Sequence, residues 1–195
     1  ENRRRLAQRL LPQSLAVVNS NDVMPTNADG TMGFHQNADL FYLSGINQEE
    51  SILLLAPNAF DEKLREVLFL RESSEHLRIW EGYKYTKEHA RTVSGIQTVK
   101  WLSEFRTVFH TLMCECDHIY LNTNEHTRAV IEVESRDARF VHDCREQYPL
   151  HEYHRLARIM HELRAIKSAS ELDIIRHACG ITREGFLRVL KFVIP

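Results

Sequence analysis

Short apolar runs of strand length are spaced along the first two thirds of the chain. They occupy residues 14–20, 51–56, 66–71 and 118–122, and polar or turn-forming residues bound each of them. Such runs, rich in β-branched and aliphatic residues, predict β-strands. The runs at 51–56 and 66–71 are continuously apolar at their centres, so we expect these two strands to be buried on both faces.

Helical spacing of apolar residues lies around and between these strands. It predicts helices at residues 2–11, 73–82, 86–95 and 102–113. In the third of these, Thr86 is a suitable N-cap and Gly95 a suitable C-terminal stop. Because strands alternate with helices, the pattern places the chain in the α/β class.

From about residue 135 onward, every segment has helical spacing. Ser168 followed by Glu171 forms a capping box, which predicts that a new helix begins there and runs nearly to the end. Its apolar positions, such as Leu172 and Phe186, have little downstream sequence to pack against. We therefore expect this helix to open a domain whose remainder is missing, and a chain that begins with Glu1 rather than Met agrees with a fragment.

Composition and charge describe an ordinary globular protein. The 195 residues are 43% hydrophobic and 27% charged, with a formal net charge of −2. This balance disfavours nucleic acid as a partner, and the short run Arg3 to Arg5 reads as the polar face of an amphipathic helix. No stretch has the length of a membrane span and the first residues lack a signal-peptide core, so we expect no membrane partner and a cytoplasmic protein.

The four cysteines do not have the spacing of a zinc ribbon or of a disulfide framework. Cys114 and Cys116 form a single C-x-C pair, whereas Cys144 and Cys179 stand alone. A chain of this length does not depend on cross-links to fold, so we expect reduced and mostly inert thiols.

Histidine and glutamate are dense between residues 151 and 162. A zincin places two histidines four apart on one helical face, but His151 and His154 are three apart and His161 lies seven further on. The expected structure is a solvated helix face, with adventitious metal binding by these three histidines as the alternative. Nucleophile-elbow and phosphate-loop motifs are absent, and five acidic residues between 22 and 50 crowd into one stretch rather than lying on separate strands.

A long loop and a polar segment stand out near the amino terminus. Residues 20–35 are rich in turn formers, and a loop of this length is often functional. Directly after it, "HQNADLFYLSG" sets amides and a carboxylate ahead of an aromatic pair and a glycine.

The stretch "FHQNADLFYLSGINQEESILLL" resembles the start of the N-terminal domain of aminopeptidase P, the Xaa-Pro aminopeptidases of the creatinase and prolidase group. Three further segments agree in order and spacing: "AVVNSN", "LFLRESSEHLRIWEG" and "HELRAIKSASELDIIRHACGITREGF". Residues 96–150 match poorly. His35 stands where the family usually has Arg, and Ala169 replaces a proline.

The resemblance implies a mixed β-sheet flanked by helices in residues 1–160, followed in residues 161–195 by a linker and the first helix of a pita-bread catalytic domain. That domain would hold two manganese ions on two Asp, one His and two Glu beyond residue 195, where a bridging water attacks the amide before proline. The chain itself would carry no metal ligand, no catalytic residue and no cofactor. Its partners would be a peptide with proline at the second position and further copies of the protein, as a dimer or tetramer.

The resemblance also implies roles for individual residues. Trp80 in "IWEG" and Asp29 in the early loop would lie at the rim of the cleft and meet the substrate or a neighbouring subunit. Gln36, Asn37 and Asp39 would hold the loop in place by capping and backbone hydrogen bonds. Phe41, Tyr42 and Leu43 would anchor it in the core. The alternatives are that Trp80 is itself a core residue and that the polar residues serve structure alone.

Three functions remain open on sequence grounds. The chain is the N-terminal domain of a proline-specific metallopeptidase, a non-catalytic binding or dimerisation module, or part of a prolidase-like or creatinase-like hydrolase with the same architecture.

Overall fold

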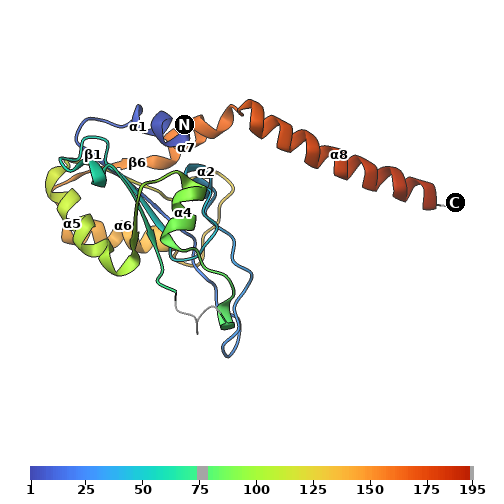
Figure 1. Ribbon diagram of the computed structural model, residues 1–195, viewed down its shortest axis with the longest axis horizontal. Helices are drawn as coiled ribbons and strands as arrows, with labels where there is room; N and C mark the ends of the chain where they lie inside the picture. The colour runs from blue at the N-terminus through green and yellow to red at the C-terminus, as the bar shows by residue number, and fades with distance from the viewer. Residues whose placement is uncertain (74–78, 194–195) are drawn as a thin grey trace. The chain divides into compact units, whose positions relative to one another are not determined.

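The computed structural model describes residues 1–73 and 79–193 (Figure 1). The chain divides into two compact units, residues 1–160 and residues 161–195. Part of the helix predicted at 73–82 lies outside the described residues, and a helical turn is seen at residues 79–81. Whether the two units are the two parts named above stays a prediction.

Strands and helices alternate through the first unit. In chain order, the elements of the whole chain are α1 Asn2–Ala7, β1 Ser14–Asn19, α2 Ala38–Ser44, β2 Ile52–Leu55, η1 Glu62–Leu64, β3 Glu66–Leu70, α4 Lys87–Ser94, β4 Thr98–Trp101, η2 Leu102–Glu104, α5 Phe105–Glu115, β5 His118–Leu121, α6 Arg136–Gln147, β6 Glu152–Arg155, α7 Leu156–Ala165 and α8 Ala169–Phe192.

The strands form one mixed sheet of six strands in the order β4-β3-β2-β1-β5-β6. The central pairs β1–β2 and β2–β3 are antiparallel. The outer pairs β3–β4, β1–β5 and β5–β6 are parallel. The side of the sheet made by β1, β5 and β6 therefore has its carboxyl ends at one edge, where ligands of α/β proteins commonly bind.

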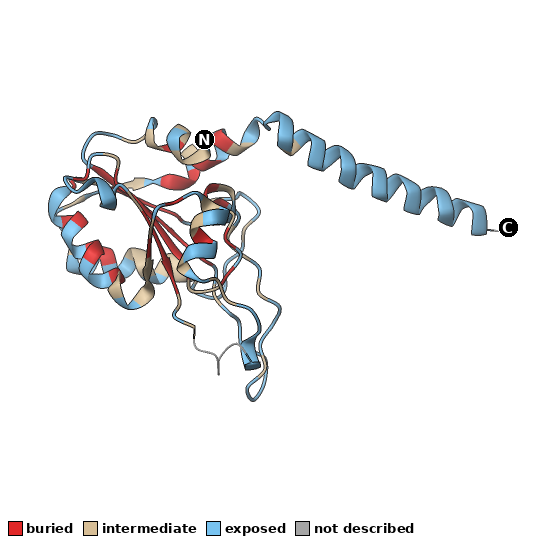
Figure 2. Ribbon diagram, viewed as in Figure 1, coloured by how far each residue is buried: buried red, intermediate tan, exposed pale blue. Residues whose placement is uncertain are grey.

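Helices cover both faces of this sheet, and the buried residues follow the strands (Figure 2). Leu15, Val17 and Ile119 pack on one face against aromatic residues of α5, including Phe105 and Phe109. Side chains alternate along a strand, so Ala16 and Val18, also buried, face the other side, on which α2 lies against β1 and β2. Every residue of β1 and of β2 is buried, as expected for strands covered on two faces.

The sequence pattern located most of these elements correctly. Strands β1, β2, β3 and β5 and helices α4, α5 and α6 are confirmed, and the α/β class with a mixed sheet is confirmed with them. Thr86 accepts a hydrogen bond from the His89 backbone N–H, and Gly95 ends α4 in the left-handed conformation.

Three elements differ from the prediction. Residues 38–44 form α2 within the polar and aromatic segment, and β4 lies in a stretch to which no element was assigned. The expectation that everything after residue 135 is helical is wrong, because Glu152–Arg155 form the edge strand β6.

Arg3 does not belong to a solvated helix face. Its guanidinium donates to the Leu43 carbonyl at 2.7 Å, to the Ser94 carbonyl at 2.9 Å and to Glu66 at 2.9 Å. Its side chain is only 16% exposed. The prediction fails for Arg3 because two carbonyls near helix C-termini and a carboxylate satisfy its charge.

The four thiols are free. Cys116 and Cys144 are buried, and burial raises the pKa of Cys116 to about 11 and that of Cys144 to about 12. Thiolates are the reactive form, so these two thiols are poor nucleophiles and poor metal ligands. Cys114 and Cys179 are exposed.

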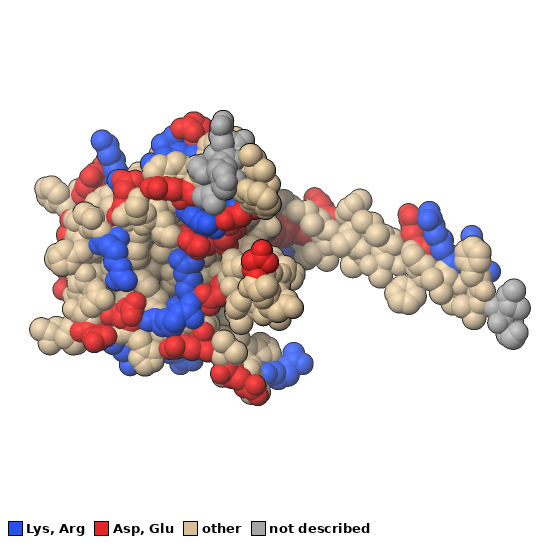
Figure 3. Space-filling model, turned by 90° about the horizontal axis from the view of Figure 1, so that it is seen from below, with Lys and Arg blue, Asp and Glu red and all other residues tan. Residues whose placement is uncertain are grey.

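Charges of both signs intermingle on the visible face of the first unit (Figure 3). Such a surface gives no electrostatic reason to attract a polyanion. Among the helices of the described residues, none combines the length and the apolarity that crossing a membrane requires.

The second unit consists mainly of α8. Ser168 accepts a hydrogen bond from the Glu171 N–H, and the Glu171 carboxylate accepts one from the Ser168 N–H at 2.8 Å, which is the predicted capping box. None of the 24 residues of α8 is buried.

Candidate functional site

The candidate site lies where β1 and β5 end and where the loop of residues 20–35 begins. Asn19 is the last residue of β1, and Asn122 directly follows β5. Helices α2 and α6 begin beside these strand ends, and each brings an aspartate in its first turn, Asp39 and Asp137.

These four residues form a buried polar cluster, in which Asp137 is the half-buried member. The Asn19 side-chain amide donates to Asp137 at 2.9 Å, and the Asn122 amide donates to Asp39 at 3.0 Å. The amide oxygens of both asparagines are buried and have no hydrogen-bond partner among the described residues. The cluster fixes the starts of α2 and α6 to two adjacent parallel strands.

The Asp137 carboxyl is strongly perturbed by this environment. Burial raises its pKa from 3.8 to about 6, and repulsion from Asp39 and Asp22 acts in the same direction. The hydrogen bond from Asn19 and the charge of Arg136 oppose this rise. Asp137 therefore changes its charge at a mildly acidic pH, unlike an exposed aspartate.

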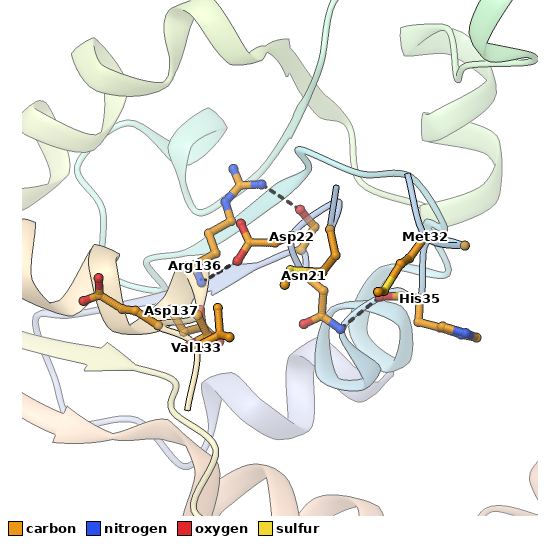
Figure 4. Close-up of a pocket in the computed structure, with 12 residues that line it drawn as sticks. Asn21, Asp22, Met32, His35, Val133, Arg136 and Asp137 are labelled. Carbon is orange, nitrogen blue, oxygen red and sulfur yellow. Dashed lines mark hydrogen bonds between the residues drawn. The ribbon is translucent and has the colours of Figure 1, made fainter. Parts of the chain in front are cut away.

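A pocket of about 370 Å³ opens beside the cluster (Figure 4). Residues of the 20–35 loop, among them Asp22 and Met32, form one side, and the start of α6 with the preceding Val133 forms the other. Its apolar wall comes from Met24, Met32 and Val133. Apolar walls with a few fixed polar groups are typical of small-ligand pockets.

Asp22, Arg136 and Asp137 of this pocket already have hydrogen-bond partners within the protein. Asp22 accepts the Arg136 backbone N–H at 2.9 Å and the Arg139 guanidinium at 2.6 Å. The Arg136 guanidinium donates to Ser20 at 2.8 Å, and its burial lowers its pKa. No nucleophile stands next to a base among the described residues that line it, so the arrangement suits binding rather than covalent chemistry.

Gln36 links the end of the loop to the segment before β2. Its side-chain NH₂ lies at 3.2 Å from the Ile46 carbonyl, 2.9 Å from the Gln48 carbonyl and 3.2 Å from the Ser51 hydroxyl. Its oxygen accepts the Asn37 N–H at 2.8 Å. The Gln36 side chain thus provides hydrogen bonds to polar groups of two loops. At the base of the 20–35 loop, the Asn21 side chain donates to the His35 carbonyl at 2.9 Å.

Asn37, rather than Asp39, is the N-cap of α2. Its side-chain oxygen accepts the Asp39 and Leu40 N–H groups at 2.9 and 3.3 Å. The carboxylate of Asp39 lies instead in the buried polar cluster, bound to Asn122. Of the three residues expected to cap or to bind backbone groups, Asn37 is the one that caps α2.

Phe41 and Tyr42 do not both pack into the core. Leu43 is buried, but Phe41 is 52% exposed, so the expectation that Phe41 anchors the segment in the core is wrong. Tyr42 is partly buried on α2 and joins α1: its hydroxyl accepts from Arg5 at 3.3 Å, and its carbonyl accepts from Asn2 at 3.0 Å. The helical period puts neighbouring residues on different faces.

Trp80 lies on the surface of the described chain, 77% exposed, which excludes the alternative that it is a core residue of this unit. Ion pairs hold the backbone around it. Arg71 binds Glu81 through two hydrogen bonds of 2.8 and 3.1 Å, and Lys84 pairs with Glu49. The Tyr85 N–H donates to the Gln48 side chain at 2.8 Å.

Asp29 lies at the tip of the 20–35 loop. A backbone bridge between Pro25 and Thr31 closes this tip, and the Thr26 N–H donates to the Gly30 carbonyl at 2.9 Å. Asp29 is exposed. The loop of Asp29 and the turn of Trp80 extend toward the same end of the first unit in Figure 1.

The structure thus places the expected residues in two arrangements. Gln36, Asn37 and Asp39 hold hydrogen-bonded positions at the base of the loop, whereas Asp29 and Trp80 are exposed on the loop tip and on a neighbouring turn. The pocket residues Asp22, Arg136 and Asp137 were missed. The sequence offered one signal for a site at this edge of the sheet, namely a polar residue at the end of each predicted strand, Asn19 and Asn122.

The comparisons with known proteins agree with this architecture. Residues 1–120 match the family described as the aminopeptidase P N-terminal domain. A Xaa-Pro aminopeptidase of Escherichia coli is 25% identical over 97% of this chain and 43% of its own length. The mitochondrial intermediate cleaving peptidase 55 of Arabidopsis thaliana is 25% identical over 96% of this chain and 36% of its own length.

Solved structures show the same fold. An aminopeptidase P structure from Bacillus anthracis superposes with a TM-score of 0.86 at 27% identity, covering 97% of this chain and 45% of that one. An aminopeptidase from Pseudomonas aeruginosa gives a TM-score of 0.79 at 22% identity, over 96% of this chain and 42% of that one. The chain spans less than half the length of these relatives. With more than half of its residues matched by the family, the chain belongs to the aminopeptidase P N-terminal domain family.

Proposed function

We propose that this chain is the N-terminal part of a manganese-dependent Xaa-Pro aminopeptidase, in which it covers the cleft and forms contacts between subunits. The observation that carries the proposal is the family match over residues 1–120, together with a Xaa-Pro aminopeptidase relative that aligns along 97% of the chain. Residues 161–195 would then begin the domain that holds the catalytic centre.

The described carboxylates of the candidate site do not fit the pair of manganese ions expected in such an enzyme. The carboxylates of Asp22, Asp39 and Asp137 already pair with arginine or asparagine donors rather than converging on a common point. Manganese prefers several oxygen ligands. We therefore assign no step of hydrolysis to these residues.

Trp80 is the residue best suited to meet a peptide. Its indole offers a flat apolar wall with a single N–H donor, which matches a proline ring beside an amide. The Arg71–Glu81 and Lys84–Glu49 pairs hold the turn that carries it. An exposed indole on a fixed turn can line a pocket that a second domain or subunit completes.

Asp29 is suited to electrostatic recognition. An exposed carboxylate on a loop tip can meet a cationic peptide amine, or an arginine across a subunit interface. The loop is anchored at its base by Asn21, so its tip can adjust while its origin stays fixed.

Trp80→Ala in the full-length protein tests the first role. We expect kcat/KM for a peptide with proline at the second position to fall by about 5- to 150-fold, which corresponds to about 1–3 kcal/mol, with an unchanged Tm. Phe60→Ala is the matched control, because Phe60 is an even more exposed aromatic residue on a different loop. A lower Tm with unchanged kcat/KM, or an equal loss in the control, would refute the assignment.

Asp29→Asn tests the second role by kinetics and by the size of the oligomer in solution. We expect a change in KM or in the dimer and tetramer populations, whereas Glu146→Gln, an exposed carboxylate on α6, should alter neither. If Asp29→Asn changes neither quantity, the loop is only a connector. A full-length protein that hydrolyses no peptide at all would favour the non-catalytic module instead.

A second candidate function follows from the relatives called intermediate cleaving peptidase 55. The Arabidopsis protein of that name is as similar to this chain, at 25% identity, as the Escherichia coli aminopeptidase. The full-length protein would then be a peptidase that cleaves intermediates, as that name says. Peptide pairs that differ only in proline or alanine at the second position distinguish the two: strict dependence on proline supports the first function, and equal cleavage supports the second.

A further inference from the structure

Two histidines and a glutamate meet on the outer strands of the sheet. Strands β5 and β6 pair in parallel, with His118 opposite Glu152 and Tyr120 opposite His154. Side chains two residues apart share a face of a strand, so these four residues lie on one face. The intervening Ile119 belongs to the core on the opposite face.

The ligand-type atoms of His118, Glu152 and His154 converge closely. His118 Nδ1 lies 3.1 Å from His154 Nε2 and 3.2 Å from Glu152 Oε2, and the remaining separation is 4.0 Å. Around a tetrahedral zinc ion with Zn–N distances of about 2.0–2.1 Å, ligand atoms are about 3.3 Å apart. Two of the three separations match this value, and the third involves the exposed and rotatable Glu152 side chain.

Hydrogen bonding alone does not satisfy this geometry well. His118 Nδ1 is approached by two potential acceptors, and one N–H cannot point at both. If His154 supplies the proton instead, the lone pair of His118 Nδ1 faces the Glu152 carboxylate. A shared cation removes the conflict, because all three atoms can then act as electron-pair donors.

The surroundings hold the site in place and leave it open to solvent. Tyr120 stacks on the His154 ring with centroids 4.8 Å apart, and its hydroxyl accepts the Leu11 N–H at 3.3 Å. A pocket of about 460 Å³, lined by Asp117, His118 and Glu152 among others, reaches the cluster. A water molecule from this pocket can complete the coordination of the ion.

The structure corrects the histidine grouping expected from the sequence. His151 points to a different partner, since its Nε2 lies 2.7 Å from the Met113 carbonyl. His154 lies on a strand rather than a helix, and His161 belongs to the other unit. The described residues contain this single group of three or more His, Cys, Asp or Glu with converging ligand atoms.

We propose that His118, Glu152 and His154 bind a zinc ion that joins the edge strand β6 to β5. Two imidazoles and one carboxylate favour zinc over manganese, calcium or magnesium, which prefer oxygen ligands. An ion bound here stabilises the folded sheet by mass action, since His118 lies 34 residues before Glu152 and the three ligands meet only when β5 and β6 pair. The proposal concerns residues 118–154 and does not depend on peptidase activity.

Calorimetric titration of the chelator-treated chain with zinc tests the proposal. We expect one zinc per chain with a Kd in the micromolar range or below, a rise in Tm on loading, and much weaker binding of manganese. His118→Ala and His154→Ala should each weaken zinc binding by at least about tenfold, because loss of a supporting outer-shell partner alone costs about 10- to 100-fold. In both variants the rise in Tm should disappear.

Two controls separate this site from other zinc-binding groups. His142→Ala removes an exposed histidine on α6, outside the proposed site. Cys114→Ser removes the accessible thiol four residues before His118. Both variants should bind zinc like the unmodified chain. If a histidine-to-alanine variant does not fold, as judged by circular dichroism, the corresponding His→Gln variant replaces it.

Three results would overturn the proposal: no zinc binding at 100 times the expected Kd, undiminished binding in both His118 and His154 variants, or loss of binding in Cys114→Ser. Cobalt substitution gives a second readout. A tetrahedral nitrogen and oxygen site produces intense visible absorption, which should vanish in His154→Ala and persist in His142→Ala. Weak octahedral absorption in the unmodified chain would contradict the geometry.

Discussion

Strand β2 and helix α8 contain similar apolar residues in opposite environments. All four residues of β2 are buried, whereas none of the 24 residues of α8 is, and Phe186, Leu190 and Phe192 are among its exposed side chains. The strand needs its neighbours on both sides to satisfy its backbone. The helix satisfies its backbone internally and begins at a local capping box, so it can be defined without a covered face.

The comparison shows that the two regions depend on different sources of stability. In residues 1–160, burial of apolar surface in a sheet between helices supplies the driving force. In α8, helix propensity and N-terminal capping supply the driving force, and both contribute little stability to a helix whose apolar face is uncovered. Exposed apolar side chains at this density indicate a surface that other protein normally covers.

Leu54→Ala and Leu190→Ala test this difference most strongly. Leu54 is completely buried in β2, so its truncation should reduce the free energy of unfolding by about 2–5 kcal/mol. Leu190 on α8 is 66% exposed, and its truncation should change that free energy by no more than about 0.5 kcal/mol. Urea unfolding measures both. Equal losses would show that α8 is packed as firmly as β2.

Asp137→Asn removes a carboxyl group whose pKa is raised in the folded protein. The folded pKa of about 6 lies above the ordinary 3.8, so ionisation of Asp137 destabilises the fold above pH 6, by up to about 3 kcal/mol. This cost disappears as the pH falls from 6 toward 4, which makes the contribution of this group more favourable in mild acid.

The variant should be more stable than the unmodified chain at pH 7 and should lose this part of the pH dependence. Its amide oxygen can still accept the hydrogen bond from Asn19, so the buried polar cluster is preserved. Denaturant titrations between pH 4.5 and 7.5 provide the measurement. An unchanged pH profile would mean that Asp137 is better solvated than its position indicates.

Ser168→Ala and Thr86→Ala give the smallest expected effects and refine the comparison. Both residues are N-caps whose side chains accept a backbone N–H, and losing such a cap costs about 1 kcal/mol. Thr86→Ala should lower the global stability of residues 1–160. Ser168→Ala should speed amide exchange in the first turns of α8 and leave the unfolding of the first unit unchanged. A global effect of Ser168→Ala would contradict the expectation that this cap acts on α8 alone.

The parts of the fold that sequence predicts are those with strong local signals. Continuous apolar runs marked β2 and β3, and a threonine cap with a glycine stop marked α4. Strand β6 was missed because its residues, Glu152 to Arg155, are polar and precede helical spacing, and only pairing with β5 makes them a strand. Helix α2 was missed because two turns carry too little periodicity.

The candidate site likewise contains residues that local sequence can indicate and residues that only the fold brings together. Gln36, Asn37 and Asp39 are close in sequence, so a local motif could indicate them. Asp22 and Arg136 are 114 residues apart, and their hydrogen bond exists because β1 and α6 meet at one edge of the sheet. The His118 and His154 pair is equally non-local, since parallel pairing of β5 and β6 sets its register.

The hydrogen bonds of Arg3 impose an order on events during synthesis of the chain. Its guanidinium needs the carbonyls of Leu43 and Ser94, and the second lies 91 residues later. A ribosome delivers residues in sequence, at about 5–20 per second. Helix α1 must therefore wait several seconds for these partners, and its docking is completed only after Ser94 has been made.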